Sequence, residues 1–183
     1  HAFDLDDIKY NKMTVKMAEE GEKFTTLDGV ERTLTSDMLV IGNQDKTLDL
    51  AGIMGGENSE IKDTTTSIFI EGASFAKENI RATSKKLGLR TEASSRFEKG
   101  IDINLAEEAV NRACQLIEEL GCGTVLNGML DYYPQKEEVQ KVTVNPVRIN
   151  KLLGVNVPMD QFINILESLE FKCNLVSSEV LEL

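Results

Sequence analysis

The sequence predicts an α+β fold: a mixed, largely antiparallel sheet assembly with packed helices, followed by a truncated small helix-turn-helix-like domain. Three observations predict it. The first hundred residues read mainly as short strands with one helical insert. A strong amphipathic pattern then runs from residue 104 to residue 120. After a polar segment, two short helical patterns follow residue 145.

Two hairpins are expected early in the chain. Lys23–Leu27 and Val30–Leu34 flank Asp28-Gly29, which favours a type I′ turn with positive φ at both central residues. Asp37–Ile41 and Thr47–Leu50 flank a longer loop rich in Gly, Asn and Asp, which predicts a second hairpin.

The next segment predicts one more strand and two helices. Ser67–Glu71 is apolar and β-branched, which indicates a central strand. Phe75–Leu87 has a helical pattern that ends at Gly88, a residue type favoured as a C-terminal stop. Thr91 can cap a short helix that runs through Phe97.

The clearest helix is Asn104–Leu120. Asn104 is a suitable N-cap, Glu107 and Glu108 lie in the positive first turn, and Gly121 ends the helix. Its apolar residues recur on one face, so we expect the helix to pack on the rest of the domain.

The domain boundary is expected just after this helix. Thr124–Tyr133 predicts a strand pair or an edge strand, and residues 134–140 are polar enough to form a linker. The chain would therefore contain one domain at residues 1–136 and an incomplete small helical domain at residues 142–183.

The second domain begins with the short strand Val142–Val144. Asn145 then caps a helix whose first residue is Pro146 and which ends at Gly154. Met159–Leu169 is a second amphipathic helix, and the last residues suggest a strand. Nothing basic lines these helices, so we expect no DNA binding.

The composition is that of an ordinary globular protein, with 41% hydrophobic and 28% charged residues in 183. No apolar run approaches the roughly 20 residues that span a bilayer, and no signal peptide is recognisable, so we expect no membrane partner. Cys114, Cys122 and Cys173 form no CxxC pair. They read as small thiols in a reducing cytosol, which predicts a cytoplasmic protein.

The charge distribution is uneven. A net charge of −11 argues against nucleic-acid binding over the whole surface. Residues 79–100 nevertheless hold six Lys or Arg against two Glu. This segment is either a phosphate-facing rim or a solvated helix face. The candidate phosphate-binding residues in it are Arg81, Lys85, Lys86, Arg90 and Arg96.

Several kinds of site lack support. His1 is the only histidine and there is no Gly-x-Ser-x-Gly elbow, so a serine-hydrolase triad is not expected. No His, Cys and Asp cluster has metal-ligand spacing, so no metal is expected. Ala51–Gly56 lacks the spacing of a P-loop or a dinucleotide-binding motif, so no nucleotide site is expected in this chain.

Three motifs carry a family resemblance. They are Ala-Gly-Ile-Met-Gly-Gly-Glu-Asn-Ser-Glu (51–60), Ser-Ile-Phe-Ile-Glu (67–71) and Gly-Leu-Arg-Thr-Glu-Ala-Ser-Ser-Arg-Phe-Glu-Lys-Gly (88–100). In this order they resemble the central editing module of the bacterial phenylalanyl-tRNA synthetase β subunit. His-Ala-Phe-Asp (1–4) resembles the entry to that module, and the segment from about Val142 resembles the start of the next small domain.

The resemblance implies hydrolysis of tyrosine wrongly attached to the tRNA for phenylalanine. It implies that Glu71 reads the tyrosine hydroxyl, that Thr91 and Ala93 line the same pocket, and that His1 lies near the scissile ester. A partly buried carboxylate left unpaired by phenylalanine discriminates strongly between the two amino acids. The alternative for Glu71 is a solvent-exposed strand end, and Thr91 can cap its helix with or without touching substrate.

The glycine-rich turn suggests the remaining chemistry. An aminoacyl ester is already activated, so hydrolysis needs a placed water and stabilisation of the developing oxyanion. Backbone N–H groups of Gly55 and Gly56 can supply the latter, because glycine lets substrate approach the chain closely. The alternative is a plain tight turn. His1 would orient the water or the terminal ribose.

The resemblance also implies partners and cofactors outside this chain. The full enzyme would be a phenylalanine–tRNA ligase that uses ATP and Mg at sites elsewhere, with no cofactor in this segment. Its partners would be the tRNA for phenylalanine, the α subunit and the tyrosine moiety of mischarged tRNA. The alternative functions are a non-catalytic module that positions tRNA and scaffolds the subunit, or a free-standing trans-editing relative. The domain start after Val142 disfavours the last.

Overall fold

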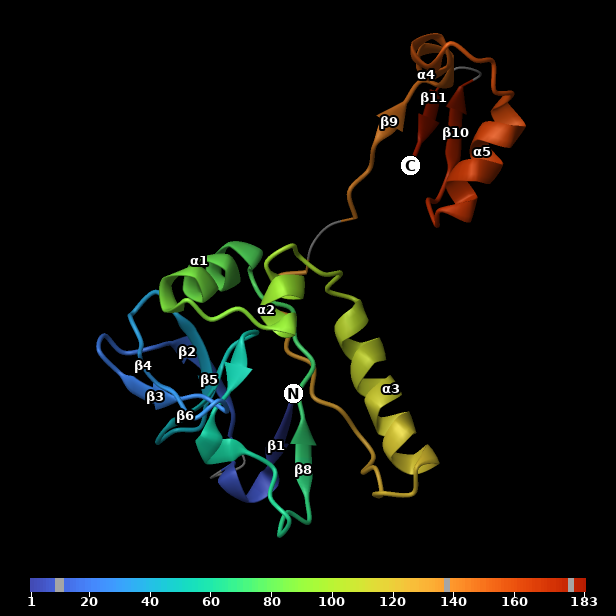
Figure 1. The fold of residues 1–183 in the computed structure, drawn as a ribbon. Coiled ribbons are helices and arrows are strands. Elements are labelled where there is room, and N and C mark those ends of the chain that lie inside the picture. The colour runs from blue at the N-terminus through green and yellow to red at the C-terminus, as the bar shows by residue number, and fades with distance from the viewer. Residues whose placement is uncertain (9–11, 137–138, 178–179) are drawn as a thin grey trace. The chain divides into compact units, whose positions relative to one another are not determined.

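The computed structural model describes residues 1–8, 12–136, 139–177 and 180–183. The chain forms two compact units, His1–Asn127 and Gly128–Leu183. Every strand pairing found among the described residues is antiparallel, which confirms the predicted α+β class (Figure 1).

The first unit is built on three small antiparallel sheets. The largest has the order β2-β5-β6-β7, formed by Thr14–Met17, Leu39–Gly42, Thr47–Leu50 and Met54–Gly55. Two strand pairs flank it: β3 with β4 (Lys23–Thr25, Glu31–Thr33), and β1 with β8 (Ala2–Asp4, Ile68–Ile70). The pairing of β5 with β6 confirms the second predicted hairpin.

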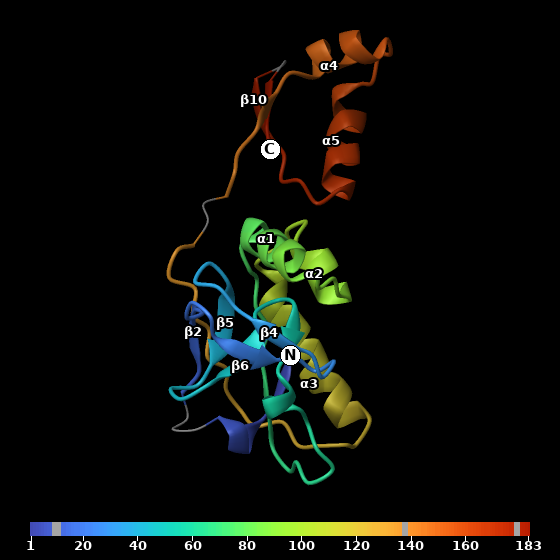
Figure 2. The same cartoon turned by 60° about the vertical axis from the view of Figure 1, so that its left-hand side comes forward.

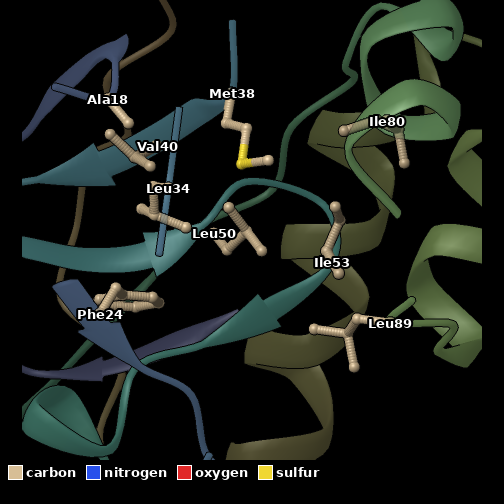
Figure 3. Packing of buried hydrophobic residues seen from close by; sticks show 9 residues of the cluster. All are labelled: Ala18, Phe24, Leu34, Met38, Val40, Leu50, Ile53, Ile80 and Leu89. Carbon is tan, nitrogen blue, oxygen red and sulfur yellow. The ribbon is translucent and has the colours of Figure 1, made fainter. Parts of the chain in front are cut away.

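Apolar residues of these strands form the core. Leu34, Val40 and Leu50 are completely buried and pack with Ile80, which comes from the helix after the sheets (Figure 3). Phe3 of β1 is also completely buried, in a second cluster with Ile41, Leu48 and Ala51. Each such side chain contributes about 1.5–3 kcal/mol through burial. The second cluster therefore attaches the β1–β8 pair to the four-stranded sheet.

Three α-helices complete this unit: α1 (Lys77–Leu87), α2 (Glu92–Phe97) and α3 (Leu105–Glu119) (Figures 1 and 2). Gly88 ends α1 in the left-handed conformation, and Thr91 caps α2, as predicted. The α3 helix is confirmed, but none of its residues is fully buried, so it packs less closely than its pattern predicts.

The close approach of α3 depends on Gly72, which follows β8. A Cβ atom at this position would lie 2.5 Å from Val110 Cγ2 and 2.9 Å from the carbonyl oxygen of Ala106. Both neighbours belong to α3. The absence of a side chain at Gly72 thus lets α3 lie against the end of β8.

Three local predictions are wrong. Ser67–Glu71 is not a central strand, because β8 pairs only with β1 among the described residues. Thr124–Tyr133 contains no strand; its apolar residues Leu126 and Leu130 are 83% and 97% exposed, so no sheet buries them. The two-residue type I′ turn between β3 and β4 is also wrong.

The turn between β3 and β4 is longer because its side chains bond one another. The register pairs Thr25 with Glu31, so residues 26–30 form the loop. Gly29 has φ +73°, but Asp28 does not have positive φ. Asp28 instead accepts from the hydroxyl of Thr26 at 2.6 Å and pairs with Arg32 at 2.6 Å.

The second unit combines two helices with a sheet of order β10-β11-β9. Its elements are β9 (Thr143–Val144), α4 (Pro146–Leu153), α5 (Met159–Ser168), β10 (Asn174–Ser177) and β11 (Val180–Glu182). Asn145 Oδ1 accepts from the backbone N–H of Arg148 at 2.8 Å, and Gly154 ends α4 in the left-handed region, as predicted. The three-stranded sheet was not part of the helix-turn-helix-like prediction. The expected linker 134–140 lies partly outside the described residues.

Candidate functional site

The site begins with a backbone pairing between residues far apart in sequence. The backbone nitrogen of His1 donates to the carbonyl of Glu71 at 2.7 Å, and the N–H of Glu71 donates to the carbonyl of His1 at 2.8 Å. These two bonds extend the β1–β8 pair by one residue. Because residues directly opposite one another present their side chains to the same face, the imidazole and the Glu71 carboxylate lie on one side of the pair.

The His1 ring fits against the glycine-rich turn. A Cβ atom at Gly55 would lie 2.8 Å from His1 Nε2. The ring also contacts Phe3, with 4.5 Å between the ring centroids. Gly55 thus leaves the space that the imidazole occupies, and β7 joins β1 and β8 at the site.

The Glu71 carboxyl group is partly buried and incompletely satisfied. Its Oε2 atom is inaccessible to solvent and has no hydrogen-bond partner among the described residues. Burial raises the pKa of Glu71 to about 7, and the neighbouring Asp49 carboxylate acts in the same direction. An acceptor in this state favours a ligand that brings a hydrogen-bond donor.

Asp49 is a site residue that sequence reasoning missed. It lies on β6, directly opposite Gly55 of β7, and is only 4% exposed. Burial raises the pKa of Asp49 to about 6. The available signal was a lone carboxylate between two leucines in the strand that leads into the glycine-rich turn.

The two glycines differ in how their backbone groups are used. The N–H of Gly56 donates to the carbonyl of Leu48 at 2.7 Å, so this donor is engaged within the sheet. The carbonyl of Gly55 accepts from the N–H of Leu27 at 3.0 Å. An oxyanion role for these glycines stays a prediction, and for Gly56 it requires the bond to Leu48 to open.

Thr91 links α2 to the same glycine-rich turn. Its hydroxyl donates to the carbonyl of Ile53 at 2.8 Å and accepts from the N–H of Ser94 at 3.0 Å. The predicted capping role is therefore confirmed. Ala93 is half-buried in the first turn of α2. Contact of either residue with substrate stays a prediction.

Part of the predicted basic segment is gathered into one hollow. The hollow has a volume of about 540 Å³, and its lining includes Arg81, Lys85, Arg90 and Lys99. Arg90 Nη2 pairs with Glu98 Oε1 at 3.6 Å. In the part of the chain that the structure describes, Arg81, Lys85 and Lys99 have no ion-pair partner. Their charges thus face solvent or a ligand.

Two of the predicted basic residues lie outside that hollow. Lys86 Nζ pairs with Asp37 Oδ1 at 3.0 Å and donates to Thr35 Oγ1 at 2.9 Å. Arg96 pairs with Glu92 along α2 at 3.6 Å. A second hollow of about 540 Å³, on the strand side of the unit, has mixed charge. Neither lining includes Glu71.

Among the described residues, no three His, Cys, Asp or Glu side chains are grouped so that they would hold a metal ion. None of the described helices is long and apolar enough to cross a membrane.

A match to the B3/4 domain covers residues 1–122. The chain belongs to the B3/4 domain family. The match ends five residues before the end of the first unit, at residue 127. The B3/4 domain therefore contains every site residue described above, and the second unit lies beyond it.

The B3/4 domain and the second unit together are similar to one kind of protein. The phenylalanine–tRNA ligase β subunit of Clostridium acetobutylicum is 48% identical over 170 residues, which are 93% of this chain and 22% of that protein. The corresponding subunit of Geobacter metallireducens is 45% identical over 183 residues, or 100% of this chain and 23% of that protein. The chain thus spans less than a quarter of these relatives.

One solved structure also resembles the whole chain. It is an N-terminal fragment of the phenylalanyl-tRNA synthetase β subunit from Pyrococcus horikoshii, with 17% identity and a TM-score of 0.44. The alignment covers 100% of this chain and 52% of that fragment. A score of this size supports no argument about the fold.

Proposed function

We propose that this chain is a segment of a phenylalanine–tRNA ligase β subunit and that its B3/4 domain hydrolyses tyrosine attached to the tRNA for phenylalanine. The similarity to the two β subunits supports the first part. The observation that carries the second part is the buried Oε2 of Glu71, which has no hydrogen-bond partner among the described residues and lies on the same side of the β1–β8 pair as the His1 ring.

Discrimination would rest on a hydrogen bond that only tyrosine can make. The phenolic O–H donates to the Glu71 carboxylate, whereas phenylalanine leaves that acceptor desolvated and unpaired. An unpaired buried polar group costs about 1–3 kcal/mol, or more when charged. A site of this kind rejects the analogue that lacks the donor much more strongly than a site that measures size.

Hydrolysis would use groups that adjoin the Glu71 carboxylate. The aminoacyl ester is labile, so a positioned water and stabilisation of the oxyanion suffice. The His1 imidazole packs against Gly55, where it can orient the water or the terminal ribose. Thr91 and Ala93 would complete the pocket wall beside the turn that Thr91 already contacts through Ile53.

The basic hollow would receive the tRNA backbone. Arg81, Lys85 and Lys99 offer charge that the described part of the protein does not neutralise by ion pairs, and phosphate contacts of this type position RNA. Binding of ATP and Mg, and assembly with an α subunit, would involve parts of the cytoplasmic ligase outside this chain.

The same hollow favours a second candidate function. A B3/4 domain that only positions tRNA and scaffolds the subunit would need the basic residues but not the Glu71 carboxylate. Substitution of Glu71 therefore separates the two functions.

The test compares the ligase that contains this chain with its Glu71→Ala variant and a Glu60→Ala control, since Glu60 is exposed. We expect Glu71→Ala to lose clearance of tyrosyl-tRNA by at least about tenfold, as one lost hydrogen bond of about 1.4 kcal/mol implies. Aminoacylation with phenylalanine and the Glu60→Ala control should be unchanged. Unchanged tyrosine clearance in Glu71→Ala would reject the editing assignment and favour the positioning module.

A further inference from the structure

We propose that Asp49 and Glu71 form a pair of interacting carboxylates around the His1 ring, in which the charge of Asp49 disfavours that of Glu71, and that Asp49 thereby sets the pH at which Glu71 can read tyrosine. The inference rests on the proposed function of Glu71. It assigns Asp49 as a positioning residue that acts through Glu71, not as a group that touches the reacting ester.

The strand register places Asp49 on the face of the site. Asp49 is directly opposite Gly55 in the β6–β7 ladder, so the Asp49 side chain and the Cβ direction of Gly55 share one face of the sheet. That direction meets the imidazole of His1. His1 in turn exchanges two backbone hydrogen bonds with Glu71. Four strands thus bring two carboxylates together around one ring.

Neither buried carboxylate has a full set of hydrogen-bond donors to replace the water that it loses on burial. Asp49 is 4% exposed, and no hydrogen bond to its carboxylate is found among the described residues. Glu71 Oε2 has no hydrogen-bond partner there either. Two desolvated like charges that interact favour retention of a proton by one of them, and they titrate as a pair.

The titratable side chain that adjoins both acids is the His1 imidazole, which lies against Gly55 and beside Glu71. The α3 helix meets Gly72 through Ala106 and Val110, which are uncharged. Burial raises the pKa of Asp49 to about 6 and that of Glu71 to about 7, and Asp49 adds to the latter.

The consequence is that recognition of tyrosine by Glu71 depends on pH. Ionised Glu71 accepts the phenolic O–H, whereas protonated Glu71 has lost most of that capacity. Tyrosine clearance should therefore rise with pH through the titration of the pair. Asp49→Asn removes the like charge, so Glu71 ionises at lower pH, and the acid side of the profile moves down by about one pH unit. We express tyrosine clearance near pH 6 as a fraction of the rate that the same protein reaches at high pH. This fraction should be several-fold larger in Asp49→Asn than in wild type.

The first experiment measures tyrosyl-tRNA clearance by the ligase from about pH 5.5 to pH 8.5, after subtraction of uncatalysed hydrolysis. It compares wild type, Asp49→Asn and Asp63→Asn, a control in which the replaced carboxylate is exposed. A downward shift in Asp49→Asn alone supports the pair. Intact clearance with an unshifted profile overturns it, whereas absence of wild-type clearance at every pH rejects the proposed function instead.

The second experiment tests the pair whether or not the domain edits. The side-chain carboxyl carbons of Asp and Glu are followed by ¹³C NMR against pH in the full 183-residue chain. Asp49→Asn should lower the titration midpoint of Glu71. If this variant does not fold, Glu71→Gln should lower the midpoint of Asp49, because the coupling is reciprocal. Unchanged midpoints would overturn the inference.

Discussion

At the scale of single residues, the site depends on a position without a side chain. Gly55 does not have positive φ, so its backbone does not require glycine. What requires glycine is the His1 ring, whose Nε2 lies 2.8 Å from the place of a Cβ atom. Contacts below 3.0 Å at this position force either the ring or the β7 strand to move.

We predict that Gly55→Ala displaces the His1 ring and lowers tyrosine clearance by about tenfold or more, because a misplaced group near the ester loses its orientation. His1 is the only histidine, so its ring signals in an NMR spectrum are unambiguous. The control is Gly123→Ala, where the added methyl would meet Ile117 Cγ2 at 2.9 Å and does not touch His1. Unaltered ring signals in Gly55→Ala would contradict the assigned packing.

At the scale of elements, the site lies where a two-stranded pair meets a helix. The β1–β8 pair has only two strands and is therefore weak by itself. It is held by Phe3 in the core on one side and by α3 at Gly72 on the other. The position of Glu71, next to Gly72, thus depends on how closely α3 packs.

We predict that Gly72→Ala destabilises the first unit by about 1–3 kcal/mol, because the new methyl overlaps with α3. Thermal denaturation gives the size of the effect, and hydrogen exchange in α3 shows where it acts. Adding Val110→Ala should restore only part of the loss, since the backbone carbonyl of Ala106 still lies 2.9 Å away. Full restoration, or no loss in Gly72→Ala, would show that α3 is not in close contact there.

At the scale of the whole molecule, the buried acids oppose folding at neutral pH. The folded-state pKa of Asp49 is raised from 3.8 to about 6, so the folded chain retains a proton that the unfolded chain releases. This retained proton contributes its whole stabilising effect on the folded chain below about pH 4, and the effect is lost as pH rises to about 6. Glu71 extends the same trend to about pH 7. Asp4 acts oppositely, because the hydrogen bond from Thr65 lowers its pKa.

We predict that the free energy of unfolding decreases between about pH 5 and pH 7.5, and that Asp49→Asn removes about 1–3 kcal/mol of this decrease. Urea denaturation of the chain at the two pH values measures it. Asp63→Asn, an exposed counterpart, should keep the wild-type slope. A wild-type slope in Asp49→Asn would mean that burial of this carboxylate costs little.

Elements with strong local signals could be predicted from the sequence. The stop of α1 at Gly88 and the start of α4 at Asn145-Pro146 follow from backbone preferences and caps, which involve neighbours within a few residues. The type I′ turn was wrong because Asp28 bonds Arg32 and Thr26 instead of adopting positive φ. Side-chain bonds of this kind compete with turn propensities.

By itself the sequence determined the α+β class, the main helices, and the residue types of the candidate site, in the glycine-rich turn and at the strand-end Glu71. Only the tertiary structure decided that β8 pairs with β1, that the His1 ring fills the space at Gly55, and that Asp49 lies opposite Gly55. The physical reason is the sequence separation over which each interaction acts. Caps and periodicity act within a helical turn, whereas strand pairing and charge coupling join residues tens of positions apart, where the register selects the neighbours.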